Sequence, residues 1–393
     1  MASLARCACH IGIGLGSGLV CLLPASAAQR SNHELELLSP PARPRAPSPQ
    51  PWGDTEKAEW LAKADVKKRS YKDAVIDEIL SYKGKFDVEQ YGALSQDEKR
   101  YPLFCITTKG FEDRTKPYIM VTGGTHGYEE SGVHGALLFV KDYMETYSKW
   151  FNIAVVPCVC PWGYECIQRW DNKTNDPNRS YTWANNEYLG EIDTPVEECR
   201  KLMELLKKMA VPQWLMQLDL HETTDTDAVE FMPALFSRDG VPFEFEEVPD
   251  GFYLIGDVEE PRTEWHAAMI EAVSQVTHIA EPIPTLFPEG NLIGLRVTQK
   301  GACTSKAAGK GKGVTHALYC STTEVYPDSK NSKTKNGARR VTKEQSNLAQ
   351  ATCIVSGIDW LLEKVVLADQ AAVLEKTLER LSGDLDELSA AAA

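Results

Sequence analysis

The chain has 393 residues, of which 43% are hydrophobic and 25% are charged, a composition typical of a globular protein. Its formal net charge of -14 argues against a nucleic-acid or an anionic-membrane partner, because either would require a basic face. Beyond residue 28, no stretch approaches the roughly 20 apolar residues that a membrane-spanning helix needs. The length allows one large core or two ordinary ones.

The two ends of the chain differ in composition from its middle. Residues 1–28 combine a basic residue, an apolar stretch and small residues suited to cleavage. This pattern resembles a signal peptide, and it also fits an organelle-targeting sequence or a disordered tail, so export and a cytoplasmic or organellar location both stay open. Residues 29–54 are rich in proline and predict an extended linker. We expect the globular domain at 55–366 and a peripheral helix with a tail at 367–393.

Strand-like and helix-like patterns alternate along the middle of the chain. Short apolar runs predict strands, and apolar residues at helical spacing predict helices. Strands are expected at 103–108, 118–121, 152–159, 214–220 and 317–326, and helices at 58–64, 71–82, 132–147, 194–208, 262–277, 341–364 and 369–388. Thr194 and Glu197 predict a capping box, and 161–192 predicts a polar, aromatic loop. The alternation predicts an α/β fold, a three-layer α/β/α sandwich around a mixed, mostly parallel sheet.

A glycine turn follows the strand expected at 118–121. Gly123 and Gly124 end the apolar run, and His126 and Glu129 follow three residues apart. In α/β folds such turns lie at the carboxyl ends of strands, where functional sites collect. An imidazole and a carboxylate at such a turn can share a Zn²⁺ ion, which takes N and O ligands at about 2.0–2.2 Å. The pair alone is weak evidence, because this spacing often arises by coincidence.

His221 is the best candidate for a third metal ligand. It directly follows the apolar strand 214–220, so it lies at a strand end as His126 does. A catalytic zinc site takes three protein ligands and leaves the fourth position to water. His134 and His316 fit packed, supporting or rim positions. No CxxC pair occurs, so a thiolate zinc site is not expected.

A loop segment and a late glutamate complete an ordered series of motifs. The series is His126 with Glu129, Arg169, Asp176-Pro177-Asn178-Arg179, His221 and Glu324. This order resembles that of the M14-type zinc carboxypeptidases, which have the carboxypeptidase A-like fold and are related to the succinylglutamate desuccinylase and aspartoacylase group. The resemblance covers roughly residues 115–330. Each motif is loose by itself, but five motifs in the family's order rarely arise by chance.

The resemblance implies one Zn²⁺ per chain. His126, Glu129 and His221 would hold the ion and leave one position for water. Asp176 would accept the second ring proton of His126, which is the support that zinc-bound histidines usually have.

The resemblance also implies roles in catalysis and substrate binding. Arg169 would stabilise the oxyanion that forms at the scissile carbonyl. Asn178 and Arg179 would grip a substrate carboxylate, the arginine through its two-pronged guanidinium. Glu324 would take a proton from the water and pass it to the leaving nitrogen. Structural alternatives stay open: a surface ion pair for Arg179, a solvated loop position for Arg169 and a structural role for Glu324.

Three functions fit these motifs. The first is a zinc metallocarboxypeptidase that cleaves the C-terminal residue of a peptide or peptide-like amide. The second is an N-acyl amino acid deacylase, which the short spacing from Arg169 to Asn178 and the segment 218–224 favour, although no second β domain follows Glu324. The third is a non-catalytic binding protein with the same fold. For either enzyme, the expected partner is a small peptide or an N-acyl amino acid with a free carboxylate.

The chain departs from the digestive carboxypeptidases at two places. Tyr128 precedes the metal-binding glutamate, where many peptidases have an arginine. The segment 301–313 lacks the tyrosine that those enzymes carry on a mobile loop. We interpret it as a flexible flap, with Lys306, Lys310 or Lys312 available to an acidic substrate. Substrate preference therefore does not follow from the resemblance.

Overall fold

The computed structural model describes residues 50–243, 249–256, 260, 262–280, 295–297, 314–328 and 341–369. All of them belong to one compact unit, Pro49–Ala393. The segment 1–28, nearly all of the linker, the flap at 301–313 and almost all of the helix expected at 369–388 lie outside the described residues. No helix in the described part of the chain is both long and apolar enough to cross a membrane.

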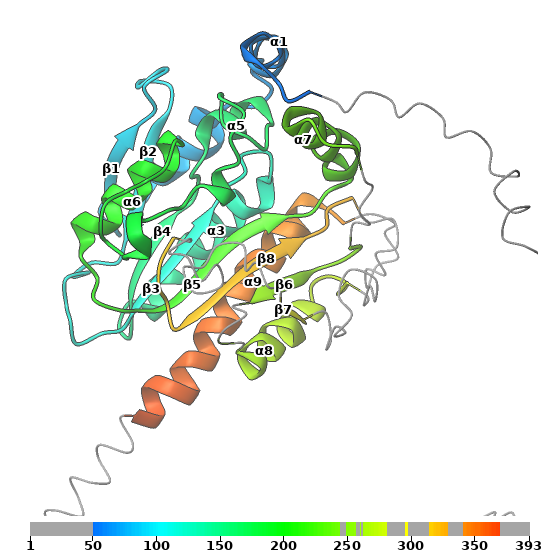
Figure 1. The fold of residues 1–393 in the computed structure, drawn as a ribbon. Coiled ribbons are helices and arrows are strands. Elements are labelled where there is room, and N and C mark those ends of the chain that lie inside the picture. Colours follow the sequence, from blue (N-terminus) through cyan, green and yellow to red (C-terminus); the bar gives the residue numbers. More distant parts are fainter. Residues whose placement is uncertain are drawn as a thin grey trace, which may run out of the picture. The chain divides into compact units, whose positions relative to one another are not determined.

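An eight-stranded sheet forms the centre of the fold (Figure 1). Its spatial order is β1 (Asp87–Ala93), β2 (Pro102–Thr107), β4 (Asn152–Val156), β3 (Tyr118–Gly123), β5 (Trp214–Glu222), β8 (Tyr319–Val325), β6 (Tyr253–Gly256) and β7 (Leu295–Val297). The central strands β4, β3, β5 and β8 run parallel, as do β6 and β7. The pairings β1–β2, β2–β4 and β6–β8 are antiparallel. The predicted mixed, mostly parallel sheet is confirmed.

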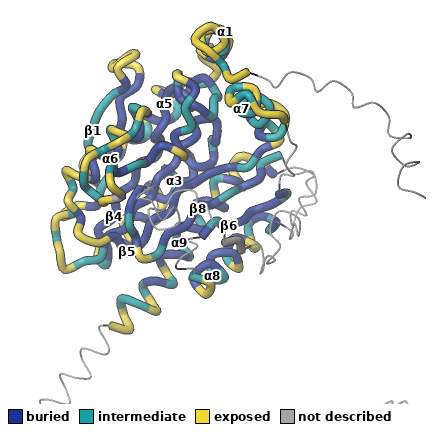
Figure 2. Tube along the Cα trace, viewed as in Figure 1, coloured by how far each residue is buried: buried dark blue, intermediate teal, exposed yellow. Residues whose placement is uncertain are grey.

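Helices cover both faces of the sheet. Alternate residues of β3 point to opposite sides, so Ile119 and Val121 enter one core, and Tyr118 and Met120 enter the other. The first core includes α3 (Glu130–Asp142), α8 (Thr263–Ser274) and α9 (Lys343–Leu361), and the second includes α6 (Glu197–Met209). Figure 2 shows the buried central strands and the exposed outer sides of the helices. The predicted three-layer α/β/α sandwich is thus confirmed.

The remaining helices are short. They are α1 (Asp54–Ala64), η2 (Lys72–Ile76), α2 (Asp77–Ser81), α4 (Met144–Tyr147), α5 (Pro161–Cys166), η3 (Pro177–Arg179), η4 (Ala184–Asn186), η5 (Asp227–Phe231), α7 (Met232–Asp239) and η6 (Leu362–Val366). The helix expected at 132–147 breaks at Tyr143, where φ is -125°. The strand expected to reach residue 159 ends at Val156, because Pro157 has no backbone N–H to donate.

Two local predictions were wrong. The loop expected at 161–192 begins with α5, whose first residue is Pro161, a position that suits a helix start. The capping box at Thr194 and Glu197 does not form. Helix α6 begins after Val196, and Glu197 instead accepts hydrogen bonds from the backbone and hydroxyl of Ser95, at 3.1 and 2.7 Å. Glu197 therefore pairs with Ser95, which is distant in the sequence, instead of with the nearby Thr194.

The parallel centre of the sheet brings three strand ends together. Gly123 at the end of β3 lies opposite Leu220 of β5, and His221 of β5 lies opposite Glu324 of β8. The turn after β3 and the ends of β5 and β8 therefore meet at one edge of the sheet. In open α/β sheets, ligands bind at the carboxyl ends of the strands.

Candidate metal centre and active site

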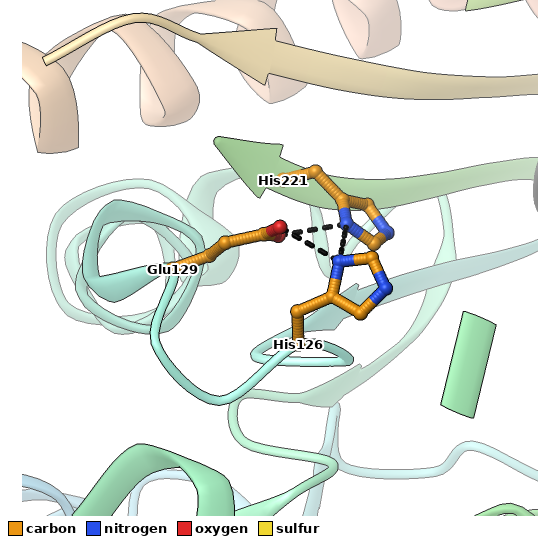
Figure 3. Close-up of side chains that lie close together, drawn as sticks. All are labelled: His126, Glu129 and His221. Carbon is orange, nitrogen blue, oxygen red and sulfur yellow. Dashed lines mark hydrogen bonds and ion pairs between the residues drawn. The ribbon is translucent and has the colours of Figure 1, made fainter. Parts of the chain in front are cut away.

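Three side chains converge at this edge of the sheet (Figure 3). His126 lies in the turn after β3, Glu129 lies just before α3 and His221 lies near the end of β5. Glu129 Oε1 is 2.7 Å from His126 Nδ1, Glu129 Oε2 is 2.7 Å from His221 Nδ1, and the two Nδ1 atoms are 3.2 Å apart. All three residues are at most 2% exposed. These three contacts bring the two imidazoles and the carboxylate together in a buried cluster.

The second nitrogen of each imidazole faces a carboxylate. His126 Nε2 lies 3.0 Å from Asp176 Oδ1, and His221 Nε2 lies 2.7 Å from Asp219 Oδ2. With a cation bound between the rings and Glu129, these contacts place the proton of each neutral ring on Nε2, because a carboxylate accepts hydrogen bonds. Both Nδ1 atoms then direct their lone pairs toward Glu129.

A cation fits among these three acceptors. Glu129 Oε2 is buried and has no hydrogen bond of good geometry within the described part of the chain, although His221 Nδ1 is near. Burial by itself raises the pKa of Glu129, but the imidazoles of His126 and His221 outweigh it and hold the pKa below its usual value. The carboxylate is therefore ionised. Two imidazole nitrogens and a carboxylate oxygen are a donor set suited to a divalent metal ion.

Close backbone packing holds the turn that carries two of these side chains. A Cβ atom at Gly127 would lie 2.0 Å from backbone atoms of Gly163 and Tyr164, so only glycine fits there. Arg69 donates to the carbonyl oxygens of Gly127 and Tyr128, at 3.0 and 3.3 Å. The Tyr128 N–H donates to the carbonyl oxygen of Gln168 at 3.1 Å. Arg69, which precedes the turn in the chain, and Gln168, which follows it, thus fix the path of the turn.

Arg169 lies beside the metal centre and is held by two carboxylates. Its Nε donates to Asp176 Oδ2 at 3.3 Å, and its Nη1 donates to Asp227 Oδ1 at 3.0 Å and to the Tyr128 hydroxyl at 3.3 Å. Nη1 is also 3.9 Å from Glu129 Oε1. Its side chain is only 20% exposed, which does not fit the alternative of a solvated loop residue.

Arg169 stays positively charged in this environment. Burial by itself lowers the pKa of Arg169, but the carboxylates of Asp176 and Asp227 outweigh it and hold the pKa above its usual value. Within the described part of the chain, the contacts of the guanidinium use Nε and Nη1. Its Nη2 edge is the part left for a substrate.

Glu324 lies on β8 beside His221. The two residues are paired in the parallel register of β5 and β8, so their side chains lie on the same face of the sheet. Thr223 donates its hydroxyl to Glu324 Oε2 at 2.9 Å, and the same oxygen of Thr223 lies 2.8 Å from the Tyr253 hydroxyl. Burial raises the pKa of Glu324 to about 7, opposed by His221 and assisted by the Glu129 carboxylate. A carboxyl group with such a pKa can both take and give a proton near neutral pH.

The segment after Arg169 forms the short helix η3. Asp176 caps it by accepting from the Asn178 N–H at 2.9 Å, while its side chain also meets His126 and Arg169. Asn178 is buried, and Arg179 is exposed with its Nη1 3.5 Å from the Asn178 carbonyl oxygen. A carboxylate clamp by Asn178 and Arg179 stays a proposal.

Asp219 and Asp227 also belong to the site, and the sequence motifs did not predict them. Asp219 could have been found, because it precedes His221 by two residues on a strand and so lies on the same face. Asp227 carries no such signal. It lies in η5 after β5, and its contact with Arg169 depends on how two distant segments pack.

Comparison with known proteins identifies solved structures that share the fold of this chain. No family model matches the sequence, and no curated protein does. A solved structure from Shewanella baltica, provisionally named as a metallopeptidase, has a TM-score of 0.51 and 13% identity, and the match covers 78% of this chain and 92% of that one. A second, from Shewanella amazonensis and named in the same way, has a TM-score of 0.52 and 16% identity over 78% of this chain and 93% of that one. The chain has a metallopeptidase fold.

The resemblance seen in the order of the motifs is therefore confirmed at the level of the fold. A metallo-carboxypeptidase from Burkholderia cenocepacia also matches, with a TM-score of 0.43 and 14% identity over 79% of this chain and 70% of that one. These similarities concern the fold, and the roles proposed for individual residues rest on the geometry described above.

Proposed function

We propose that the protein is a zinc-dependent hydrolase that removes the C-terminal residue from a peptide or a peptide-like amide. The observation that carries this proposal is the convergence of the His126 and His221 Nδ1 lone pairs on the ionised carboxylate of Glu129. Two imidazole nitrogens and a carboxylate at 2.7–3.2 Å need a proton or a metal cation among them, and the carboxylates of Asp176 and Asp219 favour the ring protons on the opposite nitrogens. Zinc suits this donor set better than calcium or magnesium, which prefer oxygen ligands.

His126, Glu129 and His221 would hold the ion. When bound, a zinc ion polarises a carbonyl group and lowers the pKa of its water to about 7. Asp176 and Asp219 would keep the ring protons on Nε2, so both Nδ1 atoms could bind the ion.

Glu324 would move the proton during hydrolysis. As a carboxylate it accepts a proton from the attacking water, and as a carboxylic acid it gives that proton to the leaving nitrogen. Its pKa of about 7 suits both states at neutral pH. The hydrogen bond from Thr223 fixes one carboxyl oxygen and leaves the other for the water.

Arg169 would stabilise the negative charge that grows on the carbonyl oxygen. Asp176, Asp227 and Tyr128 hold its guanidinium in place before the substrate arrives, so little reorganisation is needed in the transition state. Because Nε and Nη1 already donate hydrogen bonds to protein groups, Arg169 would contact the substrate through Nη2 and would not bind a carboxylate with two parallel hydrogen bonds. The grip on a substrate carboxylate would then fall to Asn178 and Arg179.

A second candidate is hydrolysis of N-acyl amino acids by the same residues. The short spacing between Arg169 and Asn178 favours it. Both reactions use the same ion, base and oxyanion-binding arginine, and they differ in the group on the acyl side of the scissile amide.

The test compares three substrate classes with one protein. Zinc-loaded protein is incubated with peptides that have a free C-terminus, with the same peptides amidated, and with N-acyl amino acids, each with and without a chelator. We expect chelator-sensitive release of the C-terminal residue from the free peptides. Cleavage of N-acyl amino acids alone would select the deacylase. Failure to bind zinc, or to cleave any substrate, would support the binding-protein alternative.

Glu324→Gln provides the matched control for this experiment. It preserves the shape of the side chain and removes the base, so zinc should bind as in the wild type while turnover falls by roughly 10²–10⁴-fold. Full activity in this variant would remove Glu324 from the mechanism.

A further inference from the structure

Asp219 is a fully buried carboxylate beside the metal centre. It lies on β5 and is 0% exposed. Burying an ionised carboxylate is costly unless hydrogen bonds replace its hydration. Three side chains supply them: Thr122 donates to Oδ1 at 2.6 Å, Thr125 donates to Oδ1 at 3.0 Å, and His221 Nε2 lies 2.7 Å from Oδ2.

The strands fix this arrangement. Asp219 and His221 are two residues apart on β5, so their side chains leave the same face of the sheet. Thr122 is the register partner of Asp219 on the neighbouring strand β3. Thr125 follows β3 in the turn that also carries His126. Asp219 thus connects the strand of one metal-binding histidine with the strand and turn of the other.

Asp176, the carboxylate that contacts His126, does not support the histidine alone. It contacts His126, Arg169 and the N-terminus of η3, and its side chain is 15% exposed. Replacing Asp176 would disturb the metal centre and Arg169 together. The contacts of Asp219 with Thr122, Thr125 and His221 belong to the strands and turn that carry the two histidines, so its replacement tests the support of His221.

We infer that Asp219 is a positioning residue that sets the metal affinity of the centre by holding the proton of His221 on Nε2 and its Nδ1 lone pair toward Glu129. This inference rests on the proposed function only in requiring that the centre binds a divalent ion. Without the carboxylate, the ring of His221 can rotate or carry its proton on Nδ1, and either change removes a ligand. Outer-shell carboxylates of this kind typically change metal affinity by 10–100-fold.

The experiment measures Zn²⁺ affinity directly. Metal-free wild type, Asp219→Asn and Thr122→Val are titrated with Zn²⁺ against a chromophoric chelator, and the thermal unfolding of each metal-free protein is recorded. We expect Asp219→Asn to weaken Zn²⁺ binding by about 10–100-fold. Thr122→Val should weaken it less, because Thr125 still orients the carboxylate.

Two further readouts separate positioning from a loss of fold. Co²⁺ bound to Asp219→Asn should show an altered d–d absorption spectrum, because a misplaced imidazole changes the ligand geometry. Glu198→Gln is the matched control: Glu198 is another buried carboxyl group, it accepts a hydrogen bond from Cys160, and its loss should leave Zn²⁺ affinity unchanged. If Asp219→Asn does not fold, Thr122→Val and the double variant Thr122→Val/Thr125→Val decide the question.

The outcomes for Asp219 and for the proposed function differ. Zn²⁺ affinity within about twofold of the wild type in folded Asp219→Asn would overturn the positioning role even if the wild type hydrolyses amides. Weakened Zn²⁺ binding in a protein that cleaves no amide would support the role of Asp219 and overturn the proposed hydrolase. Wild type that binds no Zn²⁺ would overturn both.

Discussion

Arg169 depends on neighbours that come from separate parts of the chain. Asp176 is near it in sequence, whereas Tyr128 precedes it and Asp227 follows β5. The Tyr128 hydroxyl donates to Asp227 at 2.6 Å, so the two side chains act on the guanidinium as a pair. Tyr128 stands where the digestive enzymes have an arginine. In this chain, Tyr128 carries no charge itself and instead accepts a hydrogen bond from the guanidinium of Arg169.

Asp227→Asn should therefore impair turnover more than substrate binding. The substitution removes the charge on one side of Arg169, and the guanidinium loses its preset orientation toward the growing oxyanion. We expect kcat to fall by about 10–100-fold with KM and Zn²⁺ affinity little changed. Tyr128→Phe, which removes one neutral donor worth about 0.5–1.5 kcal/mol, should show a milder form of the same change. A rise in KM with unchanged kcat would exclude this role for Asp227.

Arg179 should matter only for substrates with a free carboxylate. It is exposed at the end of η3, and a guanidinium there can pair with a C-terminal carboxylate. Arg179→Ala should lower kcat/KM for free peptides by roughly 10-fold or more and spare amidated peptides. Equal losses for both substrates would favour a surface ion pair with Asp176.

The turn between β3 and α3 is the element on which the candidate metal centre depends. It carries His126 and Glu129, packs its backbone at Gly127 against Gly163, and receives two hydrogen bonds from Arg69. The sheet can form without this exact path, because β3 has already ended at Gly123. Damage to the turn should therefore affect metal binding more than folding.

Gly127→Ala tests this element. The added Cβ would meet backbone atoms at 2.0 Å, so the turn must move away from α5. Overpacking of this kind costs about 1–3 kcal/mol and would displace both ligands of the turn. We expect the variant to fold with a lowered melting temperature and to bind less than one Zn²⁺ per chain by elemental analysis. Gly110→Ala is a control in open space, although its φ of +70° adds strain. Full zinc content in Gly127→Ala would show that the packing is dispensable.

At the scale of the whole molecule, Glu198 links pH to stability. It lies on α6 in the second core, is 4% exposed, and accepts a hydrogen bond from Cys160 Sγ at 3.3 Å. Burial raises the pKa of Glu198 to about 7, and the Asp171 carboxylate adds to this. The folded state therefore binds the proton more tightly than the unfolded chain, whose glutamate titrates near 4.3.

The direction in which stability changes with pH follows from this difference between the folded and unfolded pKa of Glu198. Below the unfolded pKa the carboxyl group is protonated in both states, and stability is not reduced. As pH rises from about 4.3 to about 7, the unfolded chain ionises first, and the free energy of unfolding falls by about 4 kcal/mol at most. Glu198→Gln cannot ionise, so it should match the wild type most closely near pH 4 and exceed it in stability at pH 8. Denaturant unfolding of the metal-free proteins at both pH values measures this, and an equal difference at both would contradict it.

The fold followed from local patterns because strands buried on both faces are strongly apolar. The runs at 118–121 and 152–159 predicted β3 and β4 in this way. The edge strand β1 was missed because its sequence, Asp87–Ala93, is half exposed and polar. Its pairing with β2 comes from tertiary packing, which a local pattern does not record.

The sequence by itself determined the candidate ligands that spacing brings together: His126 with Glu129 in one turn, and His221 at a strand end. Neighbouring residues on a turn or strand are held close by covalent geometry, so their proximity can be read without a structure. Only the tertiary structure decided which distant groups serve them. Thr122 meets Asp219 through strand register, and Asp227 meets Arg169 through the packing of η5 on the loop after α5. Register and packing depend on the whole buried surface, and no short segment contains that information.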